Sequence, residues 1–140
     1  MVGCKWIEGK TVKEPDGTLV VMEENTPIPF EIKRVFLVKD VAQGKTRGNH
    51  ATKKTRLILF PVAGSCNVVV DNGTETETYH LDDPAKGLMI DPMIWRSMQD
   101  FSDGCVLMAL CDRLFEAGNE TYDSYDEFLQ TVKTGKEAWL

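Results

Sequence analysis

Residues 66–81 read CNVVVDNGTETETYHL: a run of β-branched residues, an Asn-Gly pair, and a second run on which polar side chains alternate. Valine, threonine and tyrosine favour strands. The pair Asn72-Gly73 readily supplies the positive φ angles of a two-residue hairpin turn. We therefore predict antiparallel strands over Cys66 to Asp71 and Glu77 to Leu81, joined by a tight hairpin.

Short apolar runs of the same kind lie on both sides of this hairpin, separated by turn signals such as Pro27-Ile28-Pro29 and Ala63-Gly64-Ser65. Many short strands spaced by turn residues are typical of an all-β sandwich or barrel. The further predicted strands are Lys5 to Glu8, Thr18 to Glu23, Phe30 to Val41, Arg56 to Val62, Gly87 to Ile90, Trp95 to Gln99 and Cys105 to Cys111.

The period of the hydrophobic pattern changes from Thr121 onward, where aromatic and aliphatic residues recur at helical spacing. Ser124 and Glu127 resemble a capping box, and Gly135 is placed to end a helix. We predict one C-terminal helix over about residues 121–133. The N-terminal strands, about residues 4–24, precede the proline-bracketed segment at residues 27–29, so they could exchange with a partner subunit in a homodimer.

Composition points to one globular domain over residues 1–140, because 42% of the residues are hydrophobic and a chain of this length can bury a core. No run of 18 apolar residues and no leading signal segment is present, and the four cysteines form no Cys-x-x-Cys pair. We expect a cytoplasmic protein with reduced thiols. The net charge of −6 argues against nucleic acid or an anionic membrane as a partner.

Positive charge is concentrated in one window, Lys33 to Arg56, which holds eight of the 16 cationic side chains and one acid, Asp40. The window therefore carries +7, while the rest of the chain carries −13. One of the two histidines, His50, lies inside it. Cations beside a titratable imidazole suggest chemistry on a phosphorylated small molecule.

His50 is the candidate general base, since nearby positive charge favours its neutral form and Gly48 permits close approach of the backbone. A purely structural histidine is the alternative. On a strand, His50, Thr52, Lys54 and Arg56 would alternate onto one side, where a hydrated pocket or an anionic ligand must accommodate them. The other histidine, His80, has no such neighbours and is predicted to lie on the surface.

The surroundings of His50 hold too few ligands for a transition metal, because no second histidine and no glutamate alternate with it. We predict no metal and no cofactor.

A second candidate wall of the pocket runs from Gly87 to Arg96. There Trp95 offers an indole surface to a ring, and Arg96 offers a guanidinium to a hydroxyl or phosphate. Trp95 is equally compatible with an ordinary core position.

Read from end to end, the chain resembles the nucleotide-sugar 3,4-ketoisomerases of the cupin superfamily over about residues 5–133. The resemblance rests on PFEIKRV (29–35), RGNHA (47–51), GLMIDP (87–92) with Trp95, DFS (100–102) and YDEFL (125–129). It implies a cupin jelly-roll β-barrel with one C-terminal helix, and a homodimer with exchanged N-terminal strands. It also implies a metal-free isomerase that moves the carbonyl of a dTDP-linked 4-keto-6-deoxy sugar from C-4 to C-3, in the synthesis of deoxyamino sugars such as those of lipopolysaccharide.

The resemblance also implies roles for single residues. His50 matches the first histidine of an Arg-Gly-x-His-Ala-His motif, whereas Thr52 stands where the family has the second, so Thr52 is a candidate relay and not a base. Arg96 stands where relatives carry histidine or arginine facing the sugar. The candidates for substrate binding are Arg34, Arg47, Lys54, Arg56, Trp95 and Arg96.

Other departures from the family pattern are Phe36, Leu37 and Lys39, where tyrosines are usual. Three alternatives follow. The chain is an active ketoisomerase, a nucleotide-sugar-binding cupin that lost its activity, or an isomerase or epimerase of another keto-sugar. Nucleic-acid binding is disfavoured because the basic window lacks interleaved aromatic residues.

Overall fold

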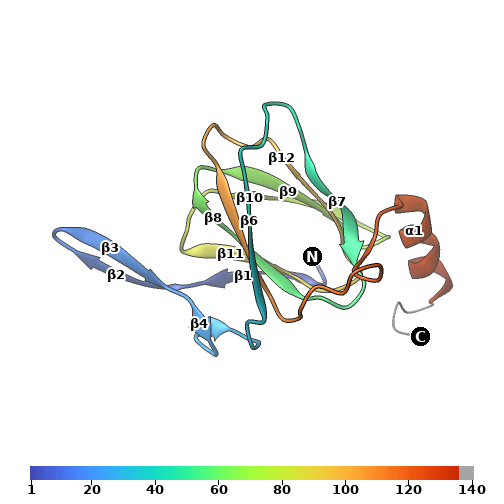
Figure 1. Ribbon diagram of the computed structural model, residues 1–140, viewed down its shortest axis with the longest axis horizontal. Helices are drawn as coiled ribbons and strands as arrows, with labels where there is room; N and C mark the ends of the chain where they lie inside the picture. The colour runs from blue at the N-terminus through green and yellow to red at the C-terminus, as the bar shows by residue number, and fades with distance from the viewer. Residues whose placement is uncertain (136–140) are drawn as a thin grey trace.

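Two five-stranded antiparallel sheets face each other in the computed structural model, which describes residues 1–135 (Figure 1). The β8 sheet has the order β1-β11-β8-β13-β6 and the β9 sheet has the order β10-β9-β12-β7-β14. Their strands are β1 Cys4–Glu8, β6 Arg34–Lys39, β7 Arg47–Thr52, β8 Leu57–Ala63, β9 Cys66–Asp71, β10 Thr76–Leu81, β11 Lys86–Ile90, β12 Trp95–Gln99, β13 Val106–Cys111 and β14 Thr121–Tyr122.

Alternation along the strands sorts side chains between the space inside the two sheets and the outer faces. On β8, Leu57 and Leu59 belong to the central core, whereas Ile58 and Phe60 belong to a second cluster on the outer face of the β8 sheet. The central core also holds the four cysteines, all free and buried, two of which are Cys105 and Cys111. These thiols therefore pack as small hydrophobic side chains.

The predicted hairpin is present, but its turn is longer than expected. Asp71 pairs with Thr76, so four residues, not two, connect β9 to β10. Gly73 has a φ of 98°, while the Asn72 side-chain oxygen accepts hydrogen bonds from the backbone N–H groups of Thr74 (2.9 Å) and Glu75 (3.0 Å). Asn72 therefore stabilises the loop with its side chain instead of adopting a left-handed backbone.

Several strands were not predicted. They are β2 (Lys10–Glu14), β5 (Pro27–Ile28), β7 and β14. The predicted strand Thr18 to Glu23 is divided between β3 (Gly17–Val21) and β4 (Glu23–Glu24), and the predicted strand Phe30 to Val41 is shortened to β6. The hairpin of β2 and β3 forms a separate two-stranded sheet that projects from the body of the molecule (Figure 1, left). Its residues are exposed or half-buried, so the apolar alternation on which strand prediction depends is absent.

The C-terminal helix α1 spans Tyr125–Thr134, four residues later than predicted at its start. The two predicted capping residues are confirmed: the Ser124 side chain accepts a hydrogen bond from the Glu127 N–H at 3.3 Å, and Gly135 closes the helix with a φ of 70°. The two residues Thr121 and Tyr122 instead form β14, which pairs with β7.

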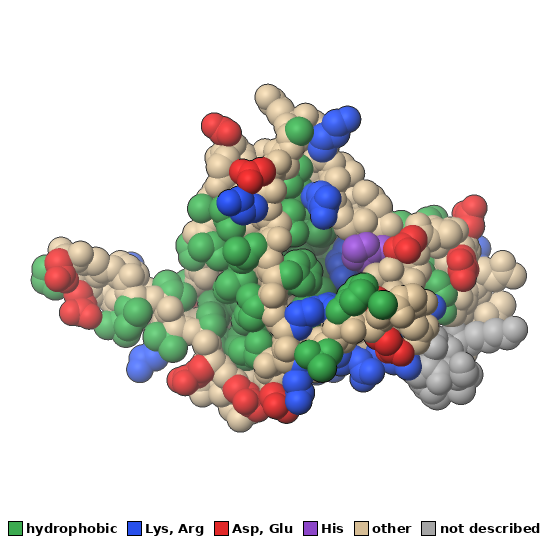
Figure 2. Space-filling model, in the orientation of Figure 1, with side chains coloured by type: hydrophobic (Ala, Val, Ile, Leu, Met, Phe, Trp, Pro, Cys, Tyr) green, Lys and Arg blue, Asp and Glu red, His purple; other side chains and the backbone are tan. Residues whose placement is uncertain are grey.

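Two strand edges remain unpaired where the sheets come together. β6 ends the β8 sheet and β14 ends the β9 sheet, and within residues 1–135 no ladder joins them. The all-β jelly-roll class is confirmed, but the sheets do not close into a barrel. Figure 2 shows hydrophobic side chains gathered over the β8 sheet, and a histidine in a recess beside Lys or Arg side chains.

Candidate active site

His50 and Arg96 are direct neighbours on the inner face of the β9 sheet. The register of β7 and β12 pairs His50 with Arg96 and then Gly48 with Ser97, so Asn49 is an extra residue in a β-bulge. Asn49 and Gly48 have φ angles of 59° and 85°, the left-handed conformation that such a bulge requires. The sequence Arg-Gly-Asn-His thus turns the imidazole inward next to a guanidinium.

The environment keeps His50 neutral. Burial lowers the pKa of the imidazole, the charge of Arg96 lowers it further, and Asp123, Glu120 and the nearby backbone of Gly48 act in the opposite direction. The result is a pKa of about 4, against an ordinary value of 6.5. The imidazole is therefore free to accept a proton at neutral pH.

Arg96 is a buried cation without a complete set of partners. Only 3% of the residue is exposed, and within residues 1–135 its Nη1 has no hydrogen-bond acceptor. Burial lowers its pKa to about 10, so the guanidinium is still charged at neutral pH. An unpaired buried N–H group costs about 1–3 kcal/mol, a cost that an oxyanion of a ligand would offset.

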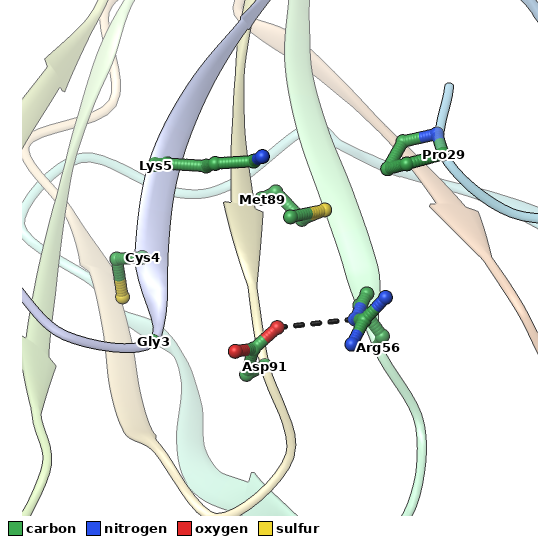
Figure 3. A pocket seen from close by; sticks show the side chains of 7 residues that line it. All are labelled: Gly3, Cys4, Lys5, Pro29, Arg56, Met89 and Asp91. Atoms are coloured by element: carbon green, nitrogen blue, oxygen red, sulfur yellow. Dashed lines mark hydrogen bonds and ion pairs between the residues drawn. The ribbon is translucent and has the colours of Figure 1, made fainter. Parts of the chain in front are cut away.

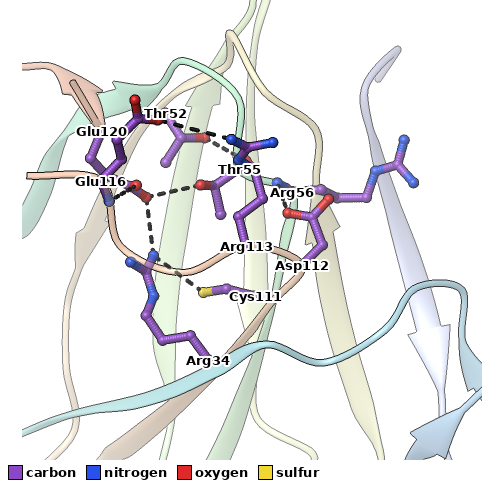
Figure 4. A network of polar contacts seen from close by, with 9 residues as sticks. All are labelled: Arg34, Thr52, Thr55, Arg56, Cys111, Asp112, Arg113, Glu116 and Glu120. Atoms are coloured by element: carbon purple, nitrogen blue, oxygen red, sulfur yellow. Dashed lines mark hydrogen bonds and ion pairs between the residues drawn. The ribbon is translucent and has the colours of Figure 1, made fainter.

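Arg34 reaches the same space from β6 and is held by Glu120 (Figure 4). Its Nη2 lies 3.0 Å from Glu120 Oε2 and 3.6 Å from the sulfur of Cys111, and the Thr55 hydroxyl donates to the same Glu120 oxygen at 3.0 Å. Burial alone would raise the pKa of Glu120, but the hydrogen bonds from Arg34, the Glu116 backbone and Thr55 lower it.

Thr52 lies on the same strand as His50 but its hydroxyl is already engaged. The side chain is 2% exposed and donates to the backbone carbonyl of Thr55 at 2.7 Å (Figure 4). In this arrangement the hydroxyl proton is held by a backbone acceptor.

Arg56 and Trp95 are not brought to His50. Because β7 ends at Thr52, the alternation does not continue to Arg56, which lies on the outer side of the β8 sheet with its Nε 3.0 Å from Asp91 Oδ1 (Figure 3). The two line a pocket of about 290 Å³ there. The prediction of a single row of side chains is therefore wrong at Arg56.

Trp95 lies on the other face of β12 from Arg96. Its indole packs against Tyr125 and Phe128 of α1, with ring centroids 5.3 and 5.8 Å apart. Neither of the two positions that the sequence left open is observed, because Trp95 lies half-buried under the helix and faces away from the imidazole.

Arg47 and Lys54 flank the site at the two ends of β7. Arg47 is exposed and Lys54 is half-buried in the bend that follows the strand. Within residues 1–135 neither forms an ion pair. His80 is exposed on β10, with Nδ1 2.7 Å from Asn67 Oδ1, and its predicted surface position is confirmed.

Two acidic residues near His50 were missed by sequence reasoning, Glu120 and Asp123. The sequence predicts that the helix begins at about residue 121, whereas Thr121 and Tyr122 form the strand β14, and Glu120 and Asp123 flank it on either side. A strand of two residues has no detectable alternation, so only the concentration of acids before the helix signalled them.

The described part of the chain contains no cluster of three His, Cys, Asp or Glu side chains suited to a metal ion. Its single helix is too short and too polar to cross a bilayer.

The fold and the site define a class of protein: a cupin-like β protein that presents a neutral imidazole, the buried guanidinium of Arg96 and the half-buried guanidinium of Arg34 between two sheets. A family model described as FdtA: WxcM-like, C-terminal matches residues 2–133. The chain is also 37% identical over 135 residues to a TDP-4-oxo-6-deoxy-α-D-glucose-3,4-oxoisomerase from Aneurinibacillus thermoaerophilus, covering 95% of this chain and 97% of that protein.

Solved structures agree. A sugar 3,4-ketoisomerase from Thermoanaerobacterium thermosaccharolyticum, in complex with TDP, superimposes with a TM-score of 0.92 at 32% identity, over 97% of this chain and 98% of that one. A TDP-fucose-3,4-ketoisomerase from Campylobacter jejuni gives 0.86 at 31% identity, over 92% and 95%. The chain belongs to the WxcM-like family of sugar 3,4-ketoisomerases, and it is an isomerase.

Proposed function

We propose that this isomerase converts a TDP-linked 4-keto-6-deoxyhexose to its 3-keto isomer, as a step in deoxyamino-sugar synthesis. The observation that carries the proposal is the pair of His50 and Arg96, a neutral base beside a buried cation with an unused N–H. The family relationship supplies the class of substrate, since the related proteins named above act on TDP-linked 6-deoxy sugars.

In the proposed reaction His50 takes the proton from C-3 of the sugar. The electron pair of that bond forms a double bond between C-3 and C-4, and the C-4 oxygen takes up a proton, which gives an enediol. Return of a proton to C-4 and loss of the C-3 hydroxyl proton leave the carbonyl at C-3. Arg96 stabilises the negative charge that develops on the oxygens.

The diphosphate is the proposed ligand of the remaining cations. Arg34 is positioned by Glu120 at the mouth of the same space, and Arg47 and Lys54 lie at the ends of β7 without carboxylate partners among the described residues. In a partly closed site, charge-assisted hydrogen bonds to a phosphate stabilise these cationic side chains more than hydrogen bonds to water do. For Arg56 and Trp95 the observed positions do not support a role in binding this substrate.

We also propose a homodimer. The outer face of the β8 sheet carries the exposed side chains Val35, Leu37 and Val62, which are 48% to 55% exposed, beside the buried cluster of Ile58 and Phe60. A second copy would cover this face, and exchange of the projecting N-terminal strands would contribute to it. In the single chain, β1 pairs with β11 of its own sheet.

We also propose that the enzyme is cytoplasmic, because its free thiols fit a reducing compartment.

Deuterium exchange tests the reaction. The protein is incubated in D₂O with a TDP-linked 4-keto-6-deoxyglucose, and NMR follows deuterium at the carbons that flank the ketone together with the appearance of the 3-keto isomer. We expect exchange and isomerisation, and a loss of about 10²- to 10⁴-fold in His50→Asn. Wild-type protein that binds the substrate but neither exchanges nor isomerises it would contradict the proposal.

Binding without turnover is the second candidate, and the engaged hydroxyl of Thr52 favours it. Thr52→His tests this candidate, because it restores a second imidazole. A large gain in rate would indicate that the natural protein lacks an acid/base group, whereas an unchanged rate would indicate that another residue already supplies it.

A further inference from the structure

Asp123 is placed next to His50 by the register of two strands. β14 runs antiparallel to β7, with Thr121 opposite Thr52 and Tyr122 opposite Ala51. One more step along this register puts Asp123 opposite His50. Residues directly opposite each other in an antiparallel pair project from the same face, with Cβ atoms about 4.5–5.5 Å apart.

The side chain of Asp123 points to that face. Thr121 Oγ1 donates to Asp123 Oδ1 at 2.7 Å, so the two side chains lie on the same side of the extended segment. Since Thr121 shares its face with Thr52, and Thr52 alternates onto the inner face with His50, Asp123 is directed toward the imidazole.

The charged groups that face His50 come from two parts of the chain, strand β12 and the segment around β14. Arg96 on β12 opposes protonation of the imidazole, while Asp123 and then Glu120, which flank β14, favour it. The two acids are not equivalent. Glu120 is occupied by Arg34, Thr55 and the backbone of Glu116, whereas Asp123 accepts a single hydrogen bond within residues 1–135, from Thr121. Asp123 is therefore the carboxylate with capacity for His50.

We propose that Asp123 is a positioning residue, which accepts a hydrogen bond from one ring nitrogen of His50 and directs the other nitrogen toward the sugar. This inference rests on the proposed function. When the imidazole takes the proton from the substrate it becomes an imidazolium, whose charge the carboxylate stabilises while staying ionised. Thr52 does not take this positioning role, because its hydroxyl donates to the Thr55 carbonyl.

The test combines kinetics with NMR on the full-length protein. The chain has only two histidines, so ¹⁵N labelling of the imidazoles resolves His50 and keeps His80 as an internal reference. In Asp123→Asn we expect kcat/KM to fall about 10-fold to 100-fold, its acid limb to move to lower pH, and the titration of His50 to move in the same direction. Asp123→Glu should recover part of both effects.

Asp103→Asn is the matched control, because Asp103 is exposed in the turn before β13 and forms no ion pair among the described residues. The inference is overturned if Asp123→Asn leaves the titration of His50 unchanged, whether or not the rate falls. If wild-type protein shows no isomerase activity, the proposed function fails, while the titration still decides whether Asp123 is coupled to His50.

Discussion

At the scale of residues, the site combines groups that are costly to bury. Among the described residues Arg96 has an N–H without an acceptor, and His50 is kept neutral by burial and by the same arginine. Proteins tolerate such costs mainly where a ligand or a reaction uses them. Function and stability are therefore expected to respond in opposite directions to changes at these positions.

Arg96→Met tests this opposition. Methionine fills much of the same space without the charge, so we expect the free energy of unfolding to rise by about 1 kcal/mol and the isomerase rate to fall about 100-fold. Urea denaturation and the deuterium assay measure the two quantities. The titration of His50 should move to higher pH, because its cationic neighbour is gone. A variant that is both less stable and fully active would contradict this account.

The pH dependence of stability should carry a contribution from His50. The pKa of the imidazole is 6.5 in the unfolded chain and about 4 in the folded one, so between these two pH values only the unfolded chain binds the proton. The free energy of unfolding therefore falls as the pH is lowered through this window. Because the ring is partly exposed, we expect only about 1–2 kcal/mol between pH 7 and pH 5. Urea midpoints of wild type and His50→Asn should converge toward pH 5, and parallel curves would show that the ring is not held neutral.

At the scale of elements, α1 supports the strand β14, which Glu120 and Asp123 flank. Phe128 is fully buried and packs on Trp95, which belongs to the same strand as Arg96. The helix also lies over the β9–β10 turn, where a Cβ added at Gly73 would come within 2.7 Å of Val132. The C-terminal segment is thus part of the site although it supplies no base.

Phe128→Ala should cost about 3–5 kcal/mol of stability, as for other large aromatic residues in a core. Activity per folded molecule should also decline, because β14 loses its support. Leu114→Ala is the control, since Leu114 is 71% exposed and should change stability by less than about 0.5 kcal/mol. Thermal unfolding and the deuterium assay at low temperature separate the two effects, and equal stability of both variants would refute the packing role of the helix.

Prediction from sequence succeeded where local chemistry decides the structure. The strands at Cys66–Asp71 and Trp95–Gln99, the Ser124 cap and the Gly135 stop follow from patterns of a few neighbouring residues. It failed where the pairing of strands far apart in the sequence decides the structure, as for β14 and for the side of the sheet on which Arg56 lies. The imidazole of His50 and the guanidinium groups of Arg34 and Arg96 were named from the sequence, whereas Asp123 needed the register of two strands.

At the scale of the whole molecule, the outer face of the β8 sheet exposes the apolar side chains Val35, Leu37 and Val62, which the proposed dimer would cover. We expect sedimentation equilibrium to report twice the chain mass of 15.7 kDa. Leu37→Lys, which places a charge where the side chain is 55% exposed on this face, should shift the equilibrium to monomer. Leu114→Lys is the control, because Leu114 lies in the loop after β13 and not on this face. A wild-type protein of monomeric mass would rule out the proposed dimer.

The unpaired edges of β6 and β14 have a further consequence for how molecules enter and leave. Within residues 1–135 no backbone hydrogen bonds of a β-ladder join β6 to β14. A sugar can therefore pass between these edges without breaking such bonds. Amide protons in the middle strands β8 and β9 should therefore stay protected from solvent throughout many rounds of turnover, and release of product should proceed without local unfolding of either sheet.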